Sequence, residues 1–309
     1  MIDTWQQNLP HGITLSCRAS GARGRPVLMF LHGFPEAAFV WDELLLHFSR
    51  PENGGYRCVA PNLRGYEHSS APAHVEDYRA RHLVQDITAL IDAECGANQP
   101  LAALVAHDWG GALAWAVANQ HPQRMRQLVI INAPHPGTFL RELQRNPAQQ
   151  AASEYMNFLV RPDAARLLAA DGHRRLFGFF EGMGASAVPG TPGAPPGAGW
   201  LTAAVRAQYR AVWDLGLEGG LHYYRASPFR AAHGEGVALS LPPELLHIAV
   251  PTLVLWAQED IALLPCLTEG LQAFVPDLRL VPIEGATHWV VHEQPTRVIA
   301  EIGAFLNPQ

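Results

Sequence analysis

The residue whose setting most clearly predicts chemistry is Asp108. It stands in the turn Ala106-His-Asp-Trp-Gly110, between an apolar run and a helical pattern. Small residues on both sides allow a sharp turn that holds one side chain above the end of a sheet, and the helix start favours a negative charge there. A carboxylate so placed can displace a leaving group at an sp³ carbon and form an alkyl ester. The competing interpretation is that Asp108 only caps the helix.

An alkyl ester needs a base that activates water, and His288 is the candidate. It lies in Glu284-Gly-Ala-Thr-His288, after the last predicted strand, and imidazole titrates near neutral pH. A carboxylate that orients this imidazole is expected after the preceding strand, where the sequence offers Glu259 and Asp260. The order nucleophile, acid, histidine is typical of such triads on a mostly parallel sheet. These partners favour a nucleophilic role for Asp108 over a capping role.

Backbone N–H groups aimed at the developing negative oxygen are the third requirement. We expect one from Trp109, the residue after the nucleophile, and one from Phe34 in the loop after an early strand. Gly33 allows the backbone to approach closely, and Pro35 stiffens the exit from the loop. The predicted oxyanion hole is therefore made by Phe34 and Trp109. His32 and His107 are expected to support the surrounding loops.

Short apolar runs that alternate with longer helical patterns position these residues and predict a mostly parallel sheet covered by helices. The predicted strands are Val27–Leu31, Cys58–Ala60, Leu101–Ala106, Leu128–Ile131, Thr252–Trp256 and Leu278–Val281. The predicted helices of this α/β core are Tyr78–Glu94, Asp108–Asn119 and Gln294–Leu306.

The alternation of strands and helices stops after Asn132. Residues 136–246 are helix-like, most clearly over Tyr155–Leu168 and Trp200–Leu215, and the Pro/Gly-rich stretch Val188–Gly199 is interpreted as a loop between helices. The strand pattern resumes at Pro251. We predict an α/β core formed by residues 1–135 and 247–309, interrupted by a helical cap of residues 136–246.

The composition argues against several function classes. The 309-residue chain has a net charge of −6, so it offers no basic surface for nucleic acid or an anionic membrane. The 15 histidines show no metal-binding spacing, and no metal is expected. Four isolated cysteines predict free thiols in a reducing compartment; they are Cys17, Cys58, Cys95 and Cys266. The sequence has no signal-peptide pattern and no bilayer-length apolar run, so we expect a cytoplasmic protein.

Five motifs in chain order resemble the epoxide hydrolase branch of the α/β-hydrolase superfamily. They are His32-Gly-Phe-Pro-Glu36, Arg64-Gly-Tyr66, His107-Asp-Trp-Gly-Gly111, Asn132-Ala-Pro-His-Pro136 and Thr287-His-Trp289. The resemblance covers nearly the whole chain and implies the α/β-hydrolase fold. It selects Asp260 over Glu259 as the orienting acid. It also implies an apolar epoxide and water as reactants, a vicinal diol as product, and no cofactor.

The resemblance further implies two cap phenols that donate to the epoxide oxygen as the ring opens. The family motifs match Tyr155 in a stretch that ends at Pro162, and Tyr224 in Leu221-His-Tyr-Tyr-Arg225. Tyr223 is the alternative if the register shifts by one residue. A phenol suits this role because it is a neutral donor whose proton can shift to an alkoxide. A cap tyrosine can equally pack its ring in an interface.

Haloalkane and fluoroacetate dehalogenases are close relatives that use the same type of nucleophile. Some place the acid where this chain has Asn132, and haloalkane dehalogenases often place Asn where it has Phe34. Fluoroacetate dehalogenases place Arg after the nucleophile and a His-Trp pair in the cap, where this chain has Trp109 and Tyr155-Met156. These departures favour an epoxide hydrolase. The alternatives are a dehalogenase and a non-catalytic binding protein on the same scaffold.

The cap is also expected to contribute an apolar pocket for the substrate. Phe158, Met183 and Trp213 suggest such a pocket, although apolar side chains of this kind more often belong to a core. The sequence leaves the identity of the epoxide open. It also leaves the oligomeric state open, with a homodimer among the alternatives.

Overall fold

The computed structural model describes residues 1–185, 187, 197–230 and 240–306, which contain an eight-stranded sheet. The strands are β1 (Asp3–Asn8), β2 (Thr14–Ser20), β3 (Val27–Leu31), β4 (Arg57–Pro61), β5 (Ala103–His107), β6 (Leu128–Ile131), β7 (Thr252–Ala257) and β8 (Leu278–Ile283). Their order across the sheet is β1-β2-β4-β3-β5-β6-β7-β8. The pairs β1–β2 and β2–β4 are antiparallel, and all other neighbours are parallel. The predicted mostly parallel sheet is confirmed.

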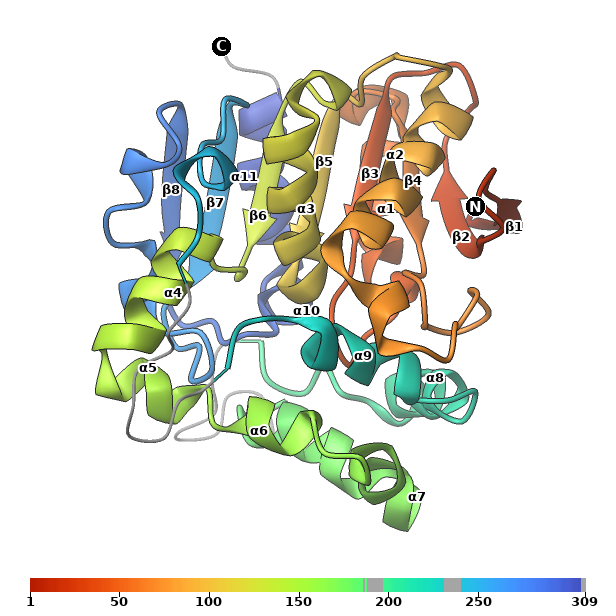
Figure 1. Cartoon of the computed structure of the whole chain (residues 1–309). Coiled ribbons are helices and arrows are strands. Elements are labelled where there is room, and N and C mark those ends of the chain that lie inside the picture. The colour runs from red at the N-terminus through yellow and green to blue at the C-terminus, as the bar shows by residue number, and fades with distance from the viewer. Residues whose placement is uncertain (186, 188–196, 231–239, 307–309) are drawn as a thin grey trace.

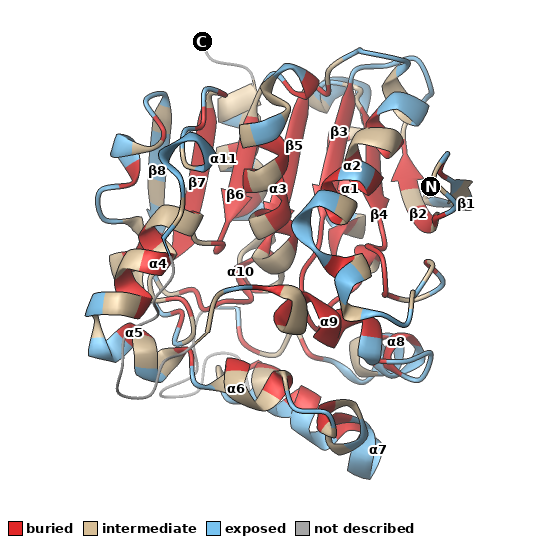
Figure 2. Cartoon of the chain, viewed as in Figure 1, coloured by how far each residue is buried: buried red, intermediate tan, exposed pale blue. Residues whose placement is uncertain are grey.

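Helices on both faces bury the central strands. The core helices are α1 (Asp42–Phe48), α2 (Ala80–Cys95), α3 (Asp108–Gln120), α10 (Val290–Glu293) and α11 (Pro295–Leu306). Helix α2 contacts α3, and α1 contacts α11; Figure 1 shows α3 in front of the sheet and α11 behind it. Every residue of β3 to β7 is buried, as their continuous apolar runs predict for parallel strands covered on both faces (Figure 2).

The cap helices lie between β6 and β7 in the chain. In the described residues they are α4 (Pro136–Arg145), α5 (Pro147–Ala152), α6 (Tyr155–Leu159), α7 (Ala164–Glu181), α8 (Ala203–Trp213) and α9 (Glu218–Ala226). Figure 1 shows α6 to α9 below the sheet, at the end where β5 passes into α3. They therefore cover the edge of the sheet to which Asp108 belongs.

The predicted secondary structure differs from the structure at one helix and at two strands. The single helix expected over Tyr155–Leu168 is two helices, α6 and α7, because Pro162 cannot continue a helix. The predicted loop Val188–Gly199 lies mostly outside the described residues, since only residues 197–199 are described. The antiparallel strands β1 and β2 were missed. Their sequences mix polar and apolar residues, and β1 is largely exposed, so neither forms a continuous apolar run.

Chemical features of the described residues add three observations. None of the helices there is long and apolar enough to cross a membrane. No group of three or more His, Cys, Asp or Glu within them could hold a metal ion. Cys17, Cys58, Cys95 and Cys266 are all free thiols.

Candidate active site

Asp108 stands at the junction of β5 and α3 with its backbone in the left-handed region, at φ 51°. Two glycines make this turn possible. A Cβ on Gly33 would overlap the Asp108 carboxylate, and a Cβ on Gly110 would overlap the carbonyl oxygens of Leu31 and His32. Small residues are thus required because two backbone segments meet at the turn. The sequence pattern predicted this geometry.

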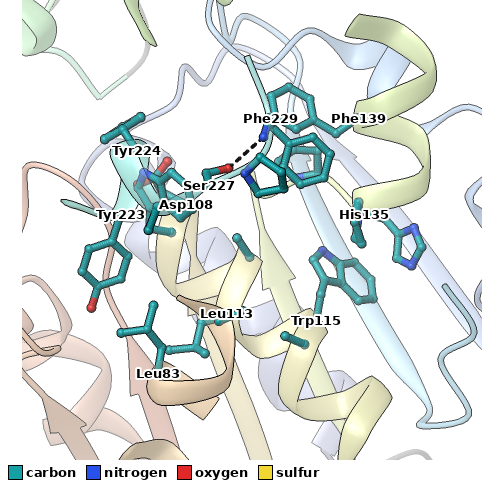
Figure 3. Close-up of a pocket in the computed structure, with 18 of the residues that line it drawn as sticks. Leu83, Asp108, Leu113, Trp115, His135, Phe139, Tyr223, Tyr224, Ser227 and Phe229 are labelled. Carbon is teal, nitrogen blue, oxygen red and sulfur yellow. Dashed lines mark hydrogen bonds between the residues drawn. The ribbon is translucent and has the colours of Figure 1, made fainter. Parts of the chain in front are cut away.

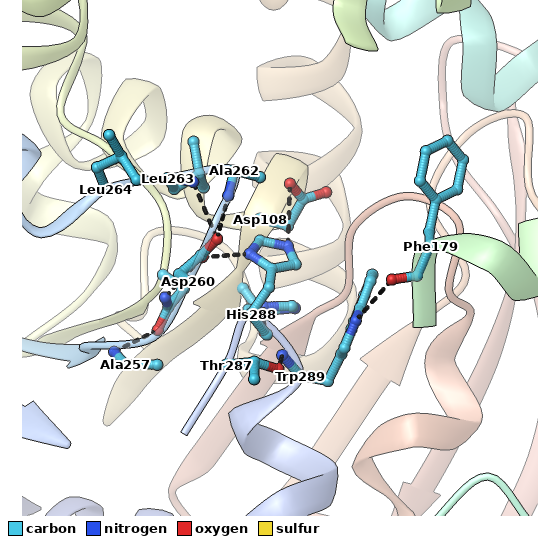
Figure 4. A network of polar contacts seen from close by, with 12 residues as sticks. Asp108, Phe179, Ala257, Asp260, Ala262, Leu263, Leu264, Thr287, His288 and Trp289 are labelled. Atoms are coloured by element: carbon cyan, nitrogen blue, oxygen red, sulfur yellow. Dashed lines mark hydrogen bonds and ion pairs between the residues drawn. The ribbon is translucent and has the colours of Figure 1, made fainter. Parts of the chain in front are cut away.

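His288 and Asp260 lie beside the Asp108 carboxylate. The Nε2 atom of His288 is 3.7 Å from Asp108 Oδ2, and its Nδ1 is 2.7 Å from Asp260 Oδ2 (Figure 4). His288 and Asp260 are both buried, whereas Glu259 is exposed. The structure therefore brings together the three residues expected to form a triad, and it places Asp260 rather than Glu259 against the imidazole.

The carboxylate of Asp260 is held by four donors. Its Oδ1 accepts hydrogen bonds from the backbone N–H groups of Ala262 and Leu263, each at 2.9 Å. Its Oδ2 accepts from the Asn132 amide at 2.8 Å as well as from His288. Burial alone would raise the pKa of Asp260, but the interaction with His288 and these hydrogen bonds outweigh it and lower the pKa. Asp260 is consequently ionised and fixed in orientation.

Asn132 contributes a contact that the sequence did not predict. It follows β6 directly, donates to Asp260, and its Oδ1 accepts from the Ala257 N–H at 2.9 Å. Asn132 was noted in the sequence only as a position where some relatives place an acid. The signal was available in the strand order, because β6 and β7 are neighbours and residues at their carboxyl ends must meet.

The imidazole of His288 responds to both carboxylates. Burial would lower its pKa, but the negative charges of Asp260 and Asp108 outweigh that effect and raise it to about 9. The His107 Nε2–H donates to the carbonyl oxygen of His288 at 2.9 Å and so holds the loop that carries His288. The His32 Nε2 accepts from the Leu63 N–H at 3.1 Å, so this imidazole likewise joins two loops.

Glu36 forms a buried polar cluster behind His107 that sequence reasoning did not assign. Its carboxylate accepts from the Tyr209 hydroxyl at 2.8 Å, and it lies 2.7 Å from His292 Nε2 and 3.3 Å from His107 Nδ1. Burial would raise the pKa of Glu36, but its interactions with His107 and His292 hold the pKa well below its usual range. Because Tyr209 belongs to α8, this cluster joins the cap helices to the core. Its only sequence signal is the position of Glu36 at the end of a matching motif.

The Phe34 N–H donates to Asp108 Oδ1 at 2.7 Å. Trp109 follows Asp108 in the first turn of α3, where backbone N–H groups have no partner within the helix. Both residues expected to form the oxyanion hole therefore adjoin the same carboxylate. The helix start and the Phe34 N–H also stabilise negative charge on Asp108.

A cavity of about 300 Å³ opens above Asp108, between α3 and the cap helices (Figure 3). Tyr155 on α6 and Tyr224 on α9 line it, with their ring centroids 6.3 Å apart. Burial raises the pKa of both phenols, and the negative charge of Asp108 raises it further. For Tyr224, the neighbouring Tyr155 adds to this effect. Both phenols are thus neutral proton donors near the carboxylate. The Tyr223 hydroxyl instead donates to the Arg64 carbonyl at 3.0 Å, so its proton is already engaged.

Most of the cavity wall is apolar, but the prediction of which cap residues form it was wrong. The lining includes Trp109, Leu113, Phe139, Met156 and Phe229. Phe158, Met183 and Trp213 do not line the cavity. Trp213 is buried among aromatic rings of the cap helices, and its indole donates to the Pro35 carbonyl at 2.7 Å. These side chains pack within the cap or against the core.

Known proteins share both the sequence pattern and the fold. Residues 26–295 match the family described as alpha/beta hydrolase fold. Epoxide hydrolase 4 of Mus musculus is 31% identical over an alignment that covers 96% of this chain and 77% of that protein. Epoxide hydrolase 3 of Xenopus tropicalis is 32% identical, with 96% and 75% covered. The chain belongs to the epoxide hydrolase branch of the α/β-hydrolase family.

Solved structures agree with this assignment. A Bacillus megaterium epoxide hydrolase crystallised with an inhibitor superposes with a TM-score of 0.86 at 29% identity, covering 98% of this chain and 100% of that one. An epoxide hydrolase from hot-environment metagenomes gives a TM-score of 0.81 at 32% identity, with both chains fully covered. The α/β-hydrolase fold implied by the sequence motifs is therefore confirmed. In this α/β-hydrolase the residue at the strand-to-helix turn is an aspartate, Asp108.

Proposed function

We propose that this epoxide hydrolase converts an apolar epoxide to a vicinal diol through an ester on Asp108. One observation carries the proposal: the Asp108 carboxylate lies between a backbone N–H donor at one oxygen and the imidazole of His288 at the other. A carboxylate that only capped α3 would need neither the buried His288–Asp260 pair nor a cavity lined by two phenols. The catalytic residues are then Asp108, His288, Asp260, Tyr155 and Tyr224.

Ester formation uses the two carboxylate oxygens differently. Asp108 Oδ1 already accepts from the Phe34 N–H, so Oδ2 is the oxygen that attacks one epoxide carbon. As the C–O bond of the ring breaks, its electron pair moves to the epoxide oxygen, which takes a proton from Tyr155 or Tyr224. Both phenols stay protonated at neutral pH because their pKa values are raised. Oδ1 becomes the carbonyl oxygen of the ester.

Ester hydrolysis begins when His288 takes a proton from water and the hydroxide adds to Cγ of Asp108. The negative charge then develops on Oδ1, which the N–H groups of Phe34 and Trp109 stabilise. Asp260 stabilises the protonated imidazole and keeps it oriented. The bond from Cγ to Oδ2 breaks, Oδ2 leaves with the diol, and the proton from His288 completes its hydroxyl group. The water oxygen remains in the carboxyl group of Asp108. The proton on that group passes to the phenolate left by the first step, so Asp108 is again a carboxylate and the phenol is again neutral.

The helices between β6 and β7 support a further part of this proposal. Residues 136–246 act as a cap that supplies Tyr155 and Tyr224, while residues 1–135 and 247–309 form the core that supplies the triad. The substrate is a small molecule, since the cavity above Asp108 has a volume of about 300 Å³. The free cysteines support a reducing compartment such as the cytoplasm.

Replacing His288 by Gln tests the covalent scheme. Removing the base leaves ester formation intact but blocks its hydrolysis, so the variant should accumulate an adduct whose mass equals that of the epoxide. Intact-protein mass spectrometry after incubation with a terminal aryl epoxide, followed by peptide mapping, locates the adduct. Asp108→Ala is the control and should gain no mass. A folded His288→Gln variant without an adduct on Asp108 would contradict the scheme.

Two further measurements separate the alternatives. Single turnover of the wild type in ¹⁸O-labelled water should place the label in the Asp108 carboxylate, because water attacks Cγ. Diol formation from epoxides and halide release from organohalides are measured side by side. Halide release without diol formation would identify a dehalogenase, and full biological activity in Asp108→Ala would identify a binding protein.

A further inference from the structure

Cap helix α5 places one polar side chain, Gln149, against the loop that carries Asp260. Gln149 is fully buried. Its amide nitrogen donates to the Ala262 carbonyl at 2.9 Å and to the Ser153 hydroxyl at 2.9 Å, and its Oε1 accepts from the Leu264 N–H at 3.0 Å. Because one end of the amide meets a carbonyl oxygen and the other an N–H group, its orientation is determined. The side chain therefore forms hydrogen bonds at two points with residues 260–264, which we call the acid loop.

The residues that Gln149 holds are interleaved with those that hold Asp260. Asp260 Oδ1 accepts from Ala262 and Leu263, while Gln149 bonds Ala262 and Leu264. Ile261, the residue after Asp260 in this loop, is 60% exposed and therefore adds little packing. A shift of this loop would move both N–H donors of Asp260 together. The same carboxylate orients His288 through Oδ2.

We propose that Gln149 is a positioning residue for ester hydrolysis, fixing the acid loop so that Asp260 stays aligned with His288. This role rests on the proposed function. Gln149 affects ester hydrolysis and not ester formation. Ester formation needs Asp108 and the two phenols, and none of these bonds Gln149 in the described residues. The cap thus contributes to both steps: Tyr155 and Tyr224 act in the first, and Gln149 supports the second from outside the cavity.

The Gln149→Met variant tests this role. Methionine has a similar length and shape but cannot form the two bonds to the loop. Rapid-quench mass spectrometry of the full-length enzyme with a terminal aryl epoxide measures ester formation and ester decay separately. We expect decay to slow by roughly 10- to 100-fold, as for other small misplacements of a catalytic group. Ester formation should stay within about twofold of the wild type, on the principle that only interactions used in a step affect its rate.

The pH profile of ester decay provides a second readout. Asp260 raises the pKa of His288, so a displaced Asp260 should lower the apparent pKa that governs decay in Gln149→Met. A purely structural role would reduce thermal stability without moving this pKa. Gln149→Glu keeps the acceptor for the Leu264 N–H and is expected to decay at a rate between those of the wild type and Gln149→Met.

Two variants serve as matched controls. Gln150 is the neighbouring glutamine on α5, and its amide donates to the Leu143 carbonyl at 2.9 Å within the cap. Gln150→Met should therefore decay at the wild-type rate. Ser153→Ala removes the bond from Gln149 to its own helix and leaves both bonds to the loop, so it should also leave decay unchanged.

Three outcomes overturn the proposal. The first is ester decay in Gln149→Met at the wild-type rate and with the wild-type pH profile. The second is a parallel loss of ester formation and decay, which would show general damage to the site. The third is the absence of any ester in the wild type, which would also overturn the reaction itself and is distinguished from the first two by the wild-type measurement alone.

Discussion

In the proposed reaction, the charge on Asp108 influences the pKa of the base that acts in the second step, His288. Its pKa of about 9 results from the charges of Asp260 and Asp108, which outweigh the opposing effect of burial. A protonated imidazole cannot activate water. Formation of the proposed ester neutralises Asp108 and removes one of the charges that raise the pKa of His288. Ester formation should therefore lower the pKa of His288 and favour the neutral imidazole that hydrolysis needs.

A neutral substitute for the ester tests this coupling. Asp108→Asn removes the negative charge and keeps the side-chain shape, so the pKa of His288 should fall below its wild-type value. Asp260→Asn should also lower it. NMR titration of the His288 ring measures both shifts. Glu259→Gln is the control, because Glu259 is adjacent in sequence but exposed, and it should change nothing. An unchanged pKa in Asp108→Asn would contradict the coupling.

Sequence patterns pointed to Asp108 and His288, but they could not choose between candidates adjacent in the chain, and they assigned no contact to Asn132 or Glu36. Asp108 and His288 could be placed because each follows a predicted strand. Glu259 and Asp260 could not be separated by pattern, since only burial shows which one meets His288. Tyr223 and Tyr224 present the same problem, because consecutive residues on a helix point about 100° apart.

Helix α9 brings Tyr224 to the cavity through a close contact between two backbones. A Cβ on Gly219, in the first turn of α9, would overlap the backbone of Gly65 in the core, and the reverse also holds. Neither side of this contact can carry a side chain. The position of Tyr224 thus depends on a pair of glycines far apart in sequence.

Gly219→Ala tests this dependence. Alanine is a better helix former than glycine by about 1 kcal/mol, so any loss must come from the contact with Gly65. Displacement of α9 should slow ester formation by roughly tenfold or more. The rate of ester formation is measured as the rate of adduct formation in a His288→Gln background. Gly178→Ala on α7 is the control, because a Cβ there meets nothing within 4 Å. Equal rates of adduct formation in the two variants would exclude the proposed constraint.

Individual elements were predictable where one local signal dominated. Strands β3 to β7 are short, mostly apolar segments that are buried along their whole length, as expected when both faces of a strand are covered. The polar–apolar mixture of β1 and β2 carries no such signal. The division between α6 and α7 was masked by apolar spacing that continues past Pro162. A second irregularity lies within α7, at residues 170–173, where three residues have left-handed backbone angles. The apolar pattern of the sequence did not indicate it.

At the scale of the whole molecule, the cavity depends on how the cap helices dock on the core. Phe139 and Phe229 come from opposite ends of the inserted segment and lie on one wall, with ring centroids 5.4 Å apart. Phe158 and Trp213 have the same apolar character but pack elsewhere. The sequence shows which residues avoid water, but only the docking determines which of them face the substrate.

The apolar wall of the cavity has a consequence for what happens after turnover. The reactant carries one weakly hydrated oxygen, whereas the product carries two hydroxyl groups that water solvates well. Leaving a hydroxyl without a hydrogen-bond partner costs about 1–3 kcal/mol in a protein interior. The epoxide should therefore bind in the cavity more tightly than the diol, and the diol should inhibit the enzyme only weakly. Its inhibition constant, measured in steady state, should exceed the KM by roughly tenfold for one such penalty. An inhibition constant of the diol close to the KM would show that the apolar wall does not discriminate between epoxide and diol.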